Sequence, residues 1–119
     1  MKWFLGLLVL FSTLYADVTV VASDGKDITS NVSSKASRCN YYFFIDKSGE
    51  VLEVVQNAHK DVRGGASYEL VAMLNEKKVS HIIAASFGDK LTGALRSNDI
   101  SYTLHKGSVE SAIEHLIKK

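Results

Sequence analysis

The chain lacks proline altogether and contains a single cysteine among its 119 residues. One cysteine cannot form an internal disulfide, which excludes a disulfide-stapled scaffold. The absence of proline excludes proline-rich linkers and polyproline recognition segments. An excess of charge of one sign is also missing, because 14 Lys and Arg residues face 13 Asp and Glu residues. Nucleic-acid-binding proteins usually carry a strongly basic face, so we expect no nucleic-acid partner.

The composition that remains is typical of a folded protein. Hydrophobic residues make up 46% of the chain and charged residues 23%. These fractions differ from those of disordered chains, which are poor in hydrophobic residues and rich in net charge. A chain of 119 residues is long enough for one domain and too short for two.

The first 16 residues have the layout of a secretory signal peptide. A short basic start, Met1-Lys2, precedes the unbroken apolar run 3–11, and the segment ends at the small residue Ala16. The 14 residues after Lys2 would span about 21 Å as a helix, less than the roughly 30 Å of a bilayer core. We therefore expect cleavage after Ala16 and a domain over 17–119 that is periplasmic or secreted, with membrane contact only before cleavage. An uncleaved interfacial anchor is the alternative.

Apolar runs bounded by turn residues predict five short strands. The turn sequence 46–49 separates the second and third strands and joins them as a hairpin. The polar segment 24–40 has no periodicity, and loops of that length in a compact domain are usually functional or mobile. The predicted strands are 17–23, 41–45, 50–55, 80–86 and 101–104.

Three helices are predicted, each opened by a pair of residues that contains glycine: Gly64-Gly65, Gly88-Asp89 and Gly107-Ser108. Beyond each pair, apolar residues recur at helical spacing. The helix faces and the buried strands together predict a core that includes Leu70, Leu74, Ile82, Ile83, Ile113 and Leu116.

The predicted order of elements is a strand, a long loop, a hairpin, and then helix, strand, helix, strand, helix. Such alternation predicts a mostly parallel sheet with helices on both faces. The fold class is therefore α/β: a single three-layer α/β/α domain with a mixed, mostly parallel sheet of about five strands and one β-hairpin. Ligands of such sheets bind beyond the carboxyl ends of the parallel strands, here 23–25 and 86–89.

Familiar catalytic motifs are missing from the chain. It contains no G-x-G-x-x-G, no P-loop, no G-x-S-x-G, no H-E-x-x-H and no C-x-x-C. Asp24, Asp46 and Asp89 near strand ends would suit a metal-dependent hydrolase, but we favour turn and cap chemistry for them. The histidines lack metal-ligand spacing; they are His59, His81, His105 and His115.

Two loops combine positive charge with glycines at a helix start. Segment 33–39 contains Lys35 and Arg38, and segment 57–65 contains Lys60 and Arg63. Glycines at a helix N-terminus let a ligand approach backbone N–H groups, where the helix dipole favours an anion. If the two loops meet, they form an anion-binding site for which the candidate residues are Lys35, Arg38, Cys39, His59, Arg63, Gly64 and Gly65.

Cys39 admits two interpretations at this point. Beside Arg38 it would be a thiolate with a lowered pKa that ligates a soft metal or acts in redox chemistry. At the start of a strand it would instead be a small buried hydrophobic residue. The residues alone favour neither.

Several short motifs follow one another in a specific order. Ser23-Asp24-Gly25 follows the first strand, the stretch 32–39 (VSSKASRC) comes next, and the hairpin returns to Asn57 before Arg63-Gly64-Gly65. In this order they resemble the dinitrogenase iron–molybdenum cofactor biosynthesis family over roughly 17–118, whose members have V-S-P-R-F-G-R-C/A and H-G-G at the corresponding places. The resemblance implies a ribonuclease H-like α/β fold and a non-enzymatic carrier of metal–sulfur clusters.

The chain departs from the family pattern at three positions. Ser34, Ala36 and Arg63 stand where the family has Pro, Phe and His. The family His is a candidate cluster ligand, so the resemblance implies that Arg63 supplies charge and hydrogen bonds there. Cys39 and His59 then remain as candidate metal ligands for an iron–sulfur or molybdenum-containing cluster. A signal peptide also differs from the nitrogenase-related members, which work in the cytoplasm.

Three functional hypotheses remain. The first is an exported, non-enzymatic module that binds a small anion, an anionic metal or a metal–sulfur cluster between the two loops. The second is a redox or sensor protein that uses the Cys39 thiol alone. The third is a small metal-dependent hydrolase that uses the aspartates at the strand ends.

Overall fold

The computed structural model describes residues 17–118. The predicted signal peptide, 1–16, lies outside the described residues. The elements follow the predicted order: β1 (Val18–Ser23), β2 (Tyr41–Ile45), β3 (Val51–Gln56), α2 (Ala66–Glu76), β4 (Val79–Ala84), α3 (Asp89–Ser97), β5 (Ser101–Leu104) and α4 (Val109–Ile117). Among the helices within 17–118, none has the length and apolar character needed to cross a membrane.

The five strands form one mixed sheet in the order β3-β2-β1-β4-β5. β1 pairs with β4, and β4 with β5, in parallel. β2 runs antiparallel to both of its neighbours, β1 and β3. β2 is therefore the one strand of this sheet that runs against the other four, which confirms the predicted mixed, mostly parallel sheet with one hairpin.

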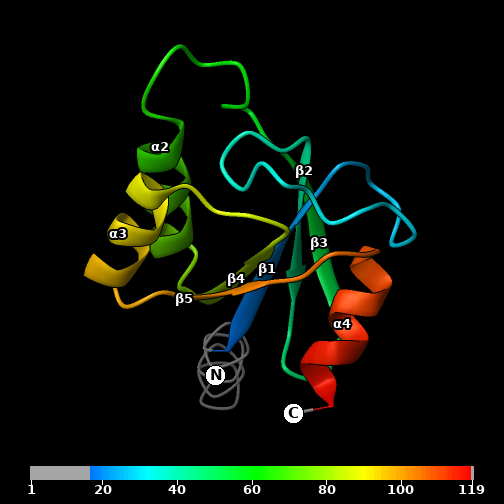
Figure 1. Cartoon of the computed structure of the whole chain (residues 1–119). Coiled ribbons are helices and arrows are strands. Elements are labelled where there is room, and N and C mark those ends of the chain that lie inside the picture. Colours follow the sequence, from blue (N-terminus) through cyan, green and yellow to red (C-terminus); the bar gives the residue numbers. More distant parts are fainter. Residues whose placement is uncertain (1–16, 119) are drawn as a thin grey trace, which may run out of the picture.

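Helices cover both faces of the sheet and give three layers (Figure 1). α2 and α3 lie on one face, where the larger core gathers around the fully buried Leu74, Ile82 and Leu95. α4 lies on the other face, where a smaller core includes Phe43, Ile83 and Val109. Alternating side chains of β1 supply both cores, because successive residues of a strand point to opposite faces.

The predicted core is correct for the strands and for α2 and overstated for α4. Leu70, Leu74, Ile82 and Ile83 are buried. Ile113 and Leu116 are only partly buried, although both pack against the smaller core. The physical reason is that, among residues 17–118, α4 is the one helix on its face of the sheet, so the outer side of its apolar stripe is not covered by another described helix (Figure 1).

The long loop 24–40 is tied to the sheet by backbone hydrogen bonds. Ser33 N–H donates to the carbonyl of Ala22 and Ala85 N–H donates to the carbonyl of Ser33, both at 2.8 Å. The Tyr42 hydroxyl donates to the carbonyl of Ala36 at 2.8 Å. These bonds hold segment 33–39 against the carboxyl ends of β1 and β4, at the end of the sheet where ligands of α/β folds bind.

Candidate functional site

The two loops singled out in the sequence meet in the structure. The buried Asn57 side chain donates to the carbonyl of Cys39 at 3.0 Å. Arg38 Nη1 donates to the carbonyls of Lys60, at 3.1 Å, and Val62, at 2.6 Å. Lys60 Nζ donates in return to Asn40 Oδ1 at 2.9 Å. Segments 33–39 and 57–65 therefore form one hydrogen-bonded unit.

Beside this unit lies a hollow of about 250 Å³, which we call the basic hollow. It opens between segment 33–39 and the first turns of α2 and α3. Three of its lining side chains are cationic, and no Asp or Glu is among the residues that line it. The lining residues are Ser34, Lys35, Ala36, Ser37, Arg38, Ser67, Ser86, Gly88, Lys90 and Leu91.

Two helix N-termini contribute to the basic hollow. Ser67 stands in the first turn of α2, and Gly88 and Lys90 stand at the start of α3. Neither helix has a side chain that caps its first N–H groups. Uncapped N–H groups and the positive end of the helix dipole both attract an anion. An added Cβ at Gly88 would meet nothing within 4 Å, so the backbone there is open to a ligand.

Hydroxyl groups complete the polar lining of the basic hollow. Ser37 Oγ and Ser67 Oγ lie 3.4 Å apart and join segment 33–39 to α2. Ser86 Oγ donates to the carbonyl of Ser34 at 2.8 Å. The lining therefore offers cations, hydroxyls and N–H groups, and it contains no imidazole or thiol. Such a site can hold an anion through charge and hydrogen bonds, but it cannot supply soft ligands to a metal.

Cys39 lies outside the basic hollow and is 2% exposed. Its Sγ lies 3.2 Å from the carbonyl oxygen of Tyr41, to which the thiol donates. Burial raises the pKa of the thiol to about 11. The raised pKa speaks against the first of the two interpretations, a thiolate with a lowered pKa. A reactive thiol needs exposure and a lowered pKa, and the structure favours the alternative interpretation of Cys39 as a small buried hydrophobic residue.

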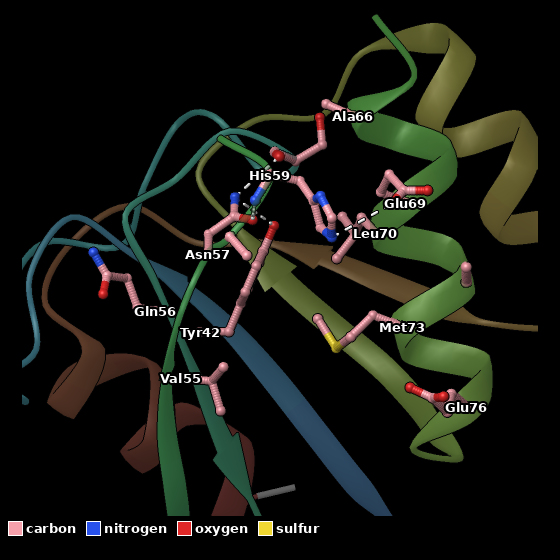
Figure 2. Close-up of a pocket in the computed structure, with 13 residues that line it drawn as sticks. Tyr42, Val55, Gln56, Asn57, His59, Ala66, Glu69, Leu70, Met73 and Glu76 are labelled. Atoms are coloured by element: carbon pink, nitrogen blue, oxygen red, sulfur yellow. Dashed lines mark hydrogen bonds and ion pairs between the residues drawn. The ribbon is translucent and has the colours of Figure 1, made fainter. Parts of the chain in front are cut away.

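His59 lines a second hollow, of about 310 Å³, between the ends of β2 and β3 and the helix α2 (Figure 2). Its Nε2 lies 3.3 Å from a carboxylate oxygen of Glu69, and its backbone N–H donates to Asn57 Oδ1 at 3.0 Å. Leu70 and Met73 of α2 provide apolar walls for this hollow (Figure 2). His59 and Cys39 do not form one metal site: within 17–118, no group of three His, Cys, Asp or Glu side chains is arranged to hold a metal ion.

Arg63, Gly64 and Gly65 form the exposed turn that precedes α2 and line neither the basic hollow nor the His59 hollow. Gly65 has φ +77°, a left-handed conformation that favours glycine. Gly64 and Gly65 have open space where a Cβ would lie. These three residues therefore shape the start of α2, while the charge at the basic hollow comes from Lys35, Arg38 and Lys90.

Lys90 and Ser67 line the basic hollow but were not among the residues expected to bind a ligand. A signal for Lys90 exists, because it directly follows 86–89, the strand end that was expected to bind ligands. Ser67 carries no such signal, because its proximity to Ser37 depends on how α2 packs.

The aspartates at the strand ends do not gather into a catalytic group. Asp46 accepts from Ser48 N–H at 2.9 Å and from Glu50 N–H at 3.0 Å, as expected for a turn. The hydrogen bond from the Ser48 hydroxyl is the main cause that holds the pKa of Asp46 below its ordinary value. This chemistry is structural and leaves the hydrolase hypothesis without support from residues 17–118.

Comparison with known proteins places this geometry in a family. The structure is similar to the NMR structure of a Thermotoga protein described as NifB and as a member of the DUF35 family, with 31% sequence identity, a TM-score of 0.70 and coverage of 86% of this chain and 88% of that chain. It also shares its fold with the apo form of the orange protein from Desulfovibrio gigas, at 19% identity, a TM-score of 0.75 and coverage of 86% and 88%. No curated protein gave a significant match. The model of the dinitrogenase iron-molybdenum cofactor family matches residues 18–119, and the chain belongs to that family.

Proposed function

We propose that the protein is an exported, non-enzymatic carrier that binds a complete anionic metal–sulfur species in the basic hollow. The cargo is an iron–sulfur or molybdenum-containing cluster, or a small thiometallate of the same charge. The observation that carries the proposal is the lining of the basic hollow, with three cations, two uncapped helix N-termini and no carboxylate.

The mode of binding follows from the donors that are present. A metal ion without its own ligands would need thiolates or imidazoles, and the basic hollow supplies neither. A cargo that already has its sulfide ligands needs only charge compensation and hydrogen bonds to its outer atoms. Arg38, Lys35 and Lys90 supply the charge, and the hydroxyls and helix N–H groups supply the hydrogen bonds.

The family membership supports this function, because the family is named after the iron–molybdenum cofactor. The structural relative described as NifB points in the same direction. Cys39 contributes no ligand in this proposal, since its thiol is buried and its pKa is raised to about 11. The proposal therefore differs from one in which the cargo is anchored by a cysteine.

Equilibrium titration with tetrathiomolybdate at two salt concentrations tests the proposal. Partly exposed charges are screened over about 10 Å at 0.1 M salt and about 3 Å at 1 M. We expect saturable binding at low salt, seen as a shift of the thiomolybdate absorption bands, and clear weakening at high salt. A parallel titration with a synthetic iron–sulfur cluster identifies which cargo is preferred. If neither donor leaves chromophore or metal on the protein after desalting, the carrier function is wrong.

The export part of the proposal needs a separate test. The proposal of export rests on the signal-peptide layout of residues 1–16. N-terminal sequencing of protein recovered from the periplasm or the medium should begin at Asp17. A chain that begins at Met1 and stays in the cytoplasmic fraction would contradict export. The proposal that the basic hollow binds an anion would not be affected.

A further inference from the structure

A third hollow, of about 420 Å³, lies on the face of the sheet that carries α4. Its floor comes from β1, β4 and β5, and one wall comes from α4. Three of the four histidines of the chain line it: His81, His105 and His115. We call it the histidine hollow. It differs from the basic hollow in position and in chemistry, so any ligand it binds is independent of the proposed carrier function.

The hydrogen bonds of His105 fix which ring nitrogen is available. Ser111 Oγ donates its only hydrogen to the carbonyl of Ser108, at 2.8 Å. The bond between His105 Nε2 and Ser111 Oγ, at 2.9 Å, must therefore have Nε2–H as its donor. In the neutral ring the other nitrogen, Nδ1, then carries the lone pair. The Nε2 and Cδ2 edge of the ring faces Gly107, so Nδ1 lies on the opposite edge.

His115 is the natural partner of that lone pair. It is exposed on α4, and its ring has no hydrogen-bond partner among residues 17–118. The ring centroids of His105 and His115 lie 5.8 Å apart. A ring nitrogen that binds an ion at about 2.0–2.1 Å puts its ring centroid about 3 Å from the ion. Two imidazoles that share one ion have centroids roughly 4.5–6.4 Å apart for N–metal–N angles of about 90–180°, and the observed separation falls within that range.

We propose that His105 and His115 form a two-histidine binding site for a first-row transition-metal ion. Imidazole suits such ions, and the general order of affinities makes Cu²⁺ the strongest binder. Ser111 acts as a positioning residue, because it fixes the ring and the tautomer of His105 in the way that outer partners fix metal-bound histidines.

The other residues that line the histidine hollow decide how many protein ligands the metal ion would have. His81 is held by the hydroxyls of Ser101, at 2.5 Å, and Thr103, at 2.7 Å, so it does not join the pair. Asp17 and Lys47 line the hollow with opposite charges. Since residues 17–118 offer no group of three ligands, water fills the other coordination positions. Such a site binds its ion in an exchangeable way.

Copper titration of the purified protein tests this proposal, with Cu²⁺ as the probe and glycine as a competing chelator. We expect one Cu²⁺ per chain and an electron paramagnetic resonance spectrum with hyperfine structure from two imidazole nitrogens. His115→Gln should weaken binding at least about tenfold, since even outer partners of a metal-bound histidine contribute that much. Ser111→Ala should weaken binding while leaving both ligands in place.

The matched control is His59→Gln, because His59 is also exposed but lies in another hollow. It should bind Cu²⁺ as the wild type does. His115 makes no hydrogen bond that folding needs, and thermal unfolding of the variant verifies this. Equal affinity of His115→Gln and wild type would overturn the proposal, and so would a copper spectrum without imidazole nitrogen.

Discussion

The two faces of the sheet differ in how much of each is covered by helices, and they differ accordingly in the side chains that the strands carry. α2 and α3 cover one face, and the core between them and the sheet consists mainly of apolar side chains. Among residues 17–118, α4 is the one helix on the other face, and the strands there carry polar residues that line the histidine hollow: Thr19, His81 and Thr103. Where a helix packs, a strand needs apolar side chains; where none packs, it can carry functional groups.

The same contrast separates the two proposed binding sites. The basic hollow lies at the end of the sheet, where uncapped helix N-termini and cations favour an anion. The histidine hollow lies on the open half of the α4 face, where imidazoles favour a metal cation. No imidazole lines the basic hollow, and the histidine hollow has one lysine where the basic hollow has three cations. The two proposed sites of this one domain therefore favour ligands of opposite charge.

The largest expected difference concerns the stability of the two faces. Leu74 is fully buried under α2, so Leu74→Ala should lower the free energy of unfolding by about 2–5 kcal/mol. Ile113 of α4 is only partly buried, so Ile113→Ala should cost about 1–2 kcal/mol. Denaturant unfolding of both variants provides the comparison. Equal losses would mean that α4 packs as tightly as α2.

A second prediction compares the charges of the two hollows. Lys35→Gln combined with Lys90→Gln should weaken thiomolybdate binding about 100-fold, at roughly tenfold for each charged hydrogen bond. The control, Lys47→Gln, removes the same kind of charge from the histidine hollow and should leave thiomolybdate binding unchanged. Isothermal titration measures all three proteins. A loss in the control as large as in the double variant would contradict a local role of the basic hollow.

Arg38→Lys tests the geometry of the site separately from its charge. Arg38 Nη1 donates to the carbonyls of both Lys60 and Val62, and the ammonium group of lysine lacks the planar, fixed donor geometry of a guanidinium. We expect binding to weaken by up to about tenfold and amide hydrogen exchange to quicken in segment 57–65. Unchanged exchange there would show that Arg38 does not hold this loop.

The smallest effect is expected at Cys39. Cys39→Ala should leave thiomolybdate binding within about twofold of wild type, because the thiol lies outside the basic hollow.

Cys39 also makes the stability of the protein depend on pH. The pKa of Cys39 is raised from 9.0 to about 11 in the folded protein, so the unfolded chain loses its proton first and stability falls as pH rises from 9 to 11.

The Cys39→Ala variant should show a shallower fall of stability over that pH window. The pKa of Tyr42 is raised mainly by burial and further by Cys39, so the part caused by burial remains in both proteins and the part caused by Cys39 adds to the difference between them. Denaturant unfolding at a series of pH values measures the difference. Identical slopes in the two proteins would show that Cys39 ionises as easily in the folded protein as in the unfolded chain.

The fold could be predicted from the sequence because its signals are local. Turn pairs such as Gly88-Asp89 and apolar periodicity around Leu70 and Leu74 set the order of elements, and that order determines the mixed sheet. The burial of Ile113 was overestimated because periodicity identifies an apolar stripe but does not report how much of it another element covers.

The residues of the candidate site follow from the sequence only in part. Lys35 and Arg38 could be singled out because they stand in a long polar loop beside a strand end, and both line the basic hollow. Cys39 and His59 do not form one site, because Cys39 is buried just before β2 while His59 is exposed and lines a different hollow; sequence does not show which way a loop side chain points. Ser67 and the His105–His115 pair depend on contacts between elements, which no local pattern encodes.

Mapping the backbone amide chemical shifts of the protein during a thiomolybdate titration tests the central claim most directly. We expect the largest shifts at the first turns of α2 and α3, at Ser67, Lys90 and Leu91, with an apparent affinity that falls as salt rises. Shifts centred on Cys39 and Tyr41, or on His105 and His115, with an affinity indifferent to salt, would contradict the assignment of the basic hollow as the anion site.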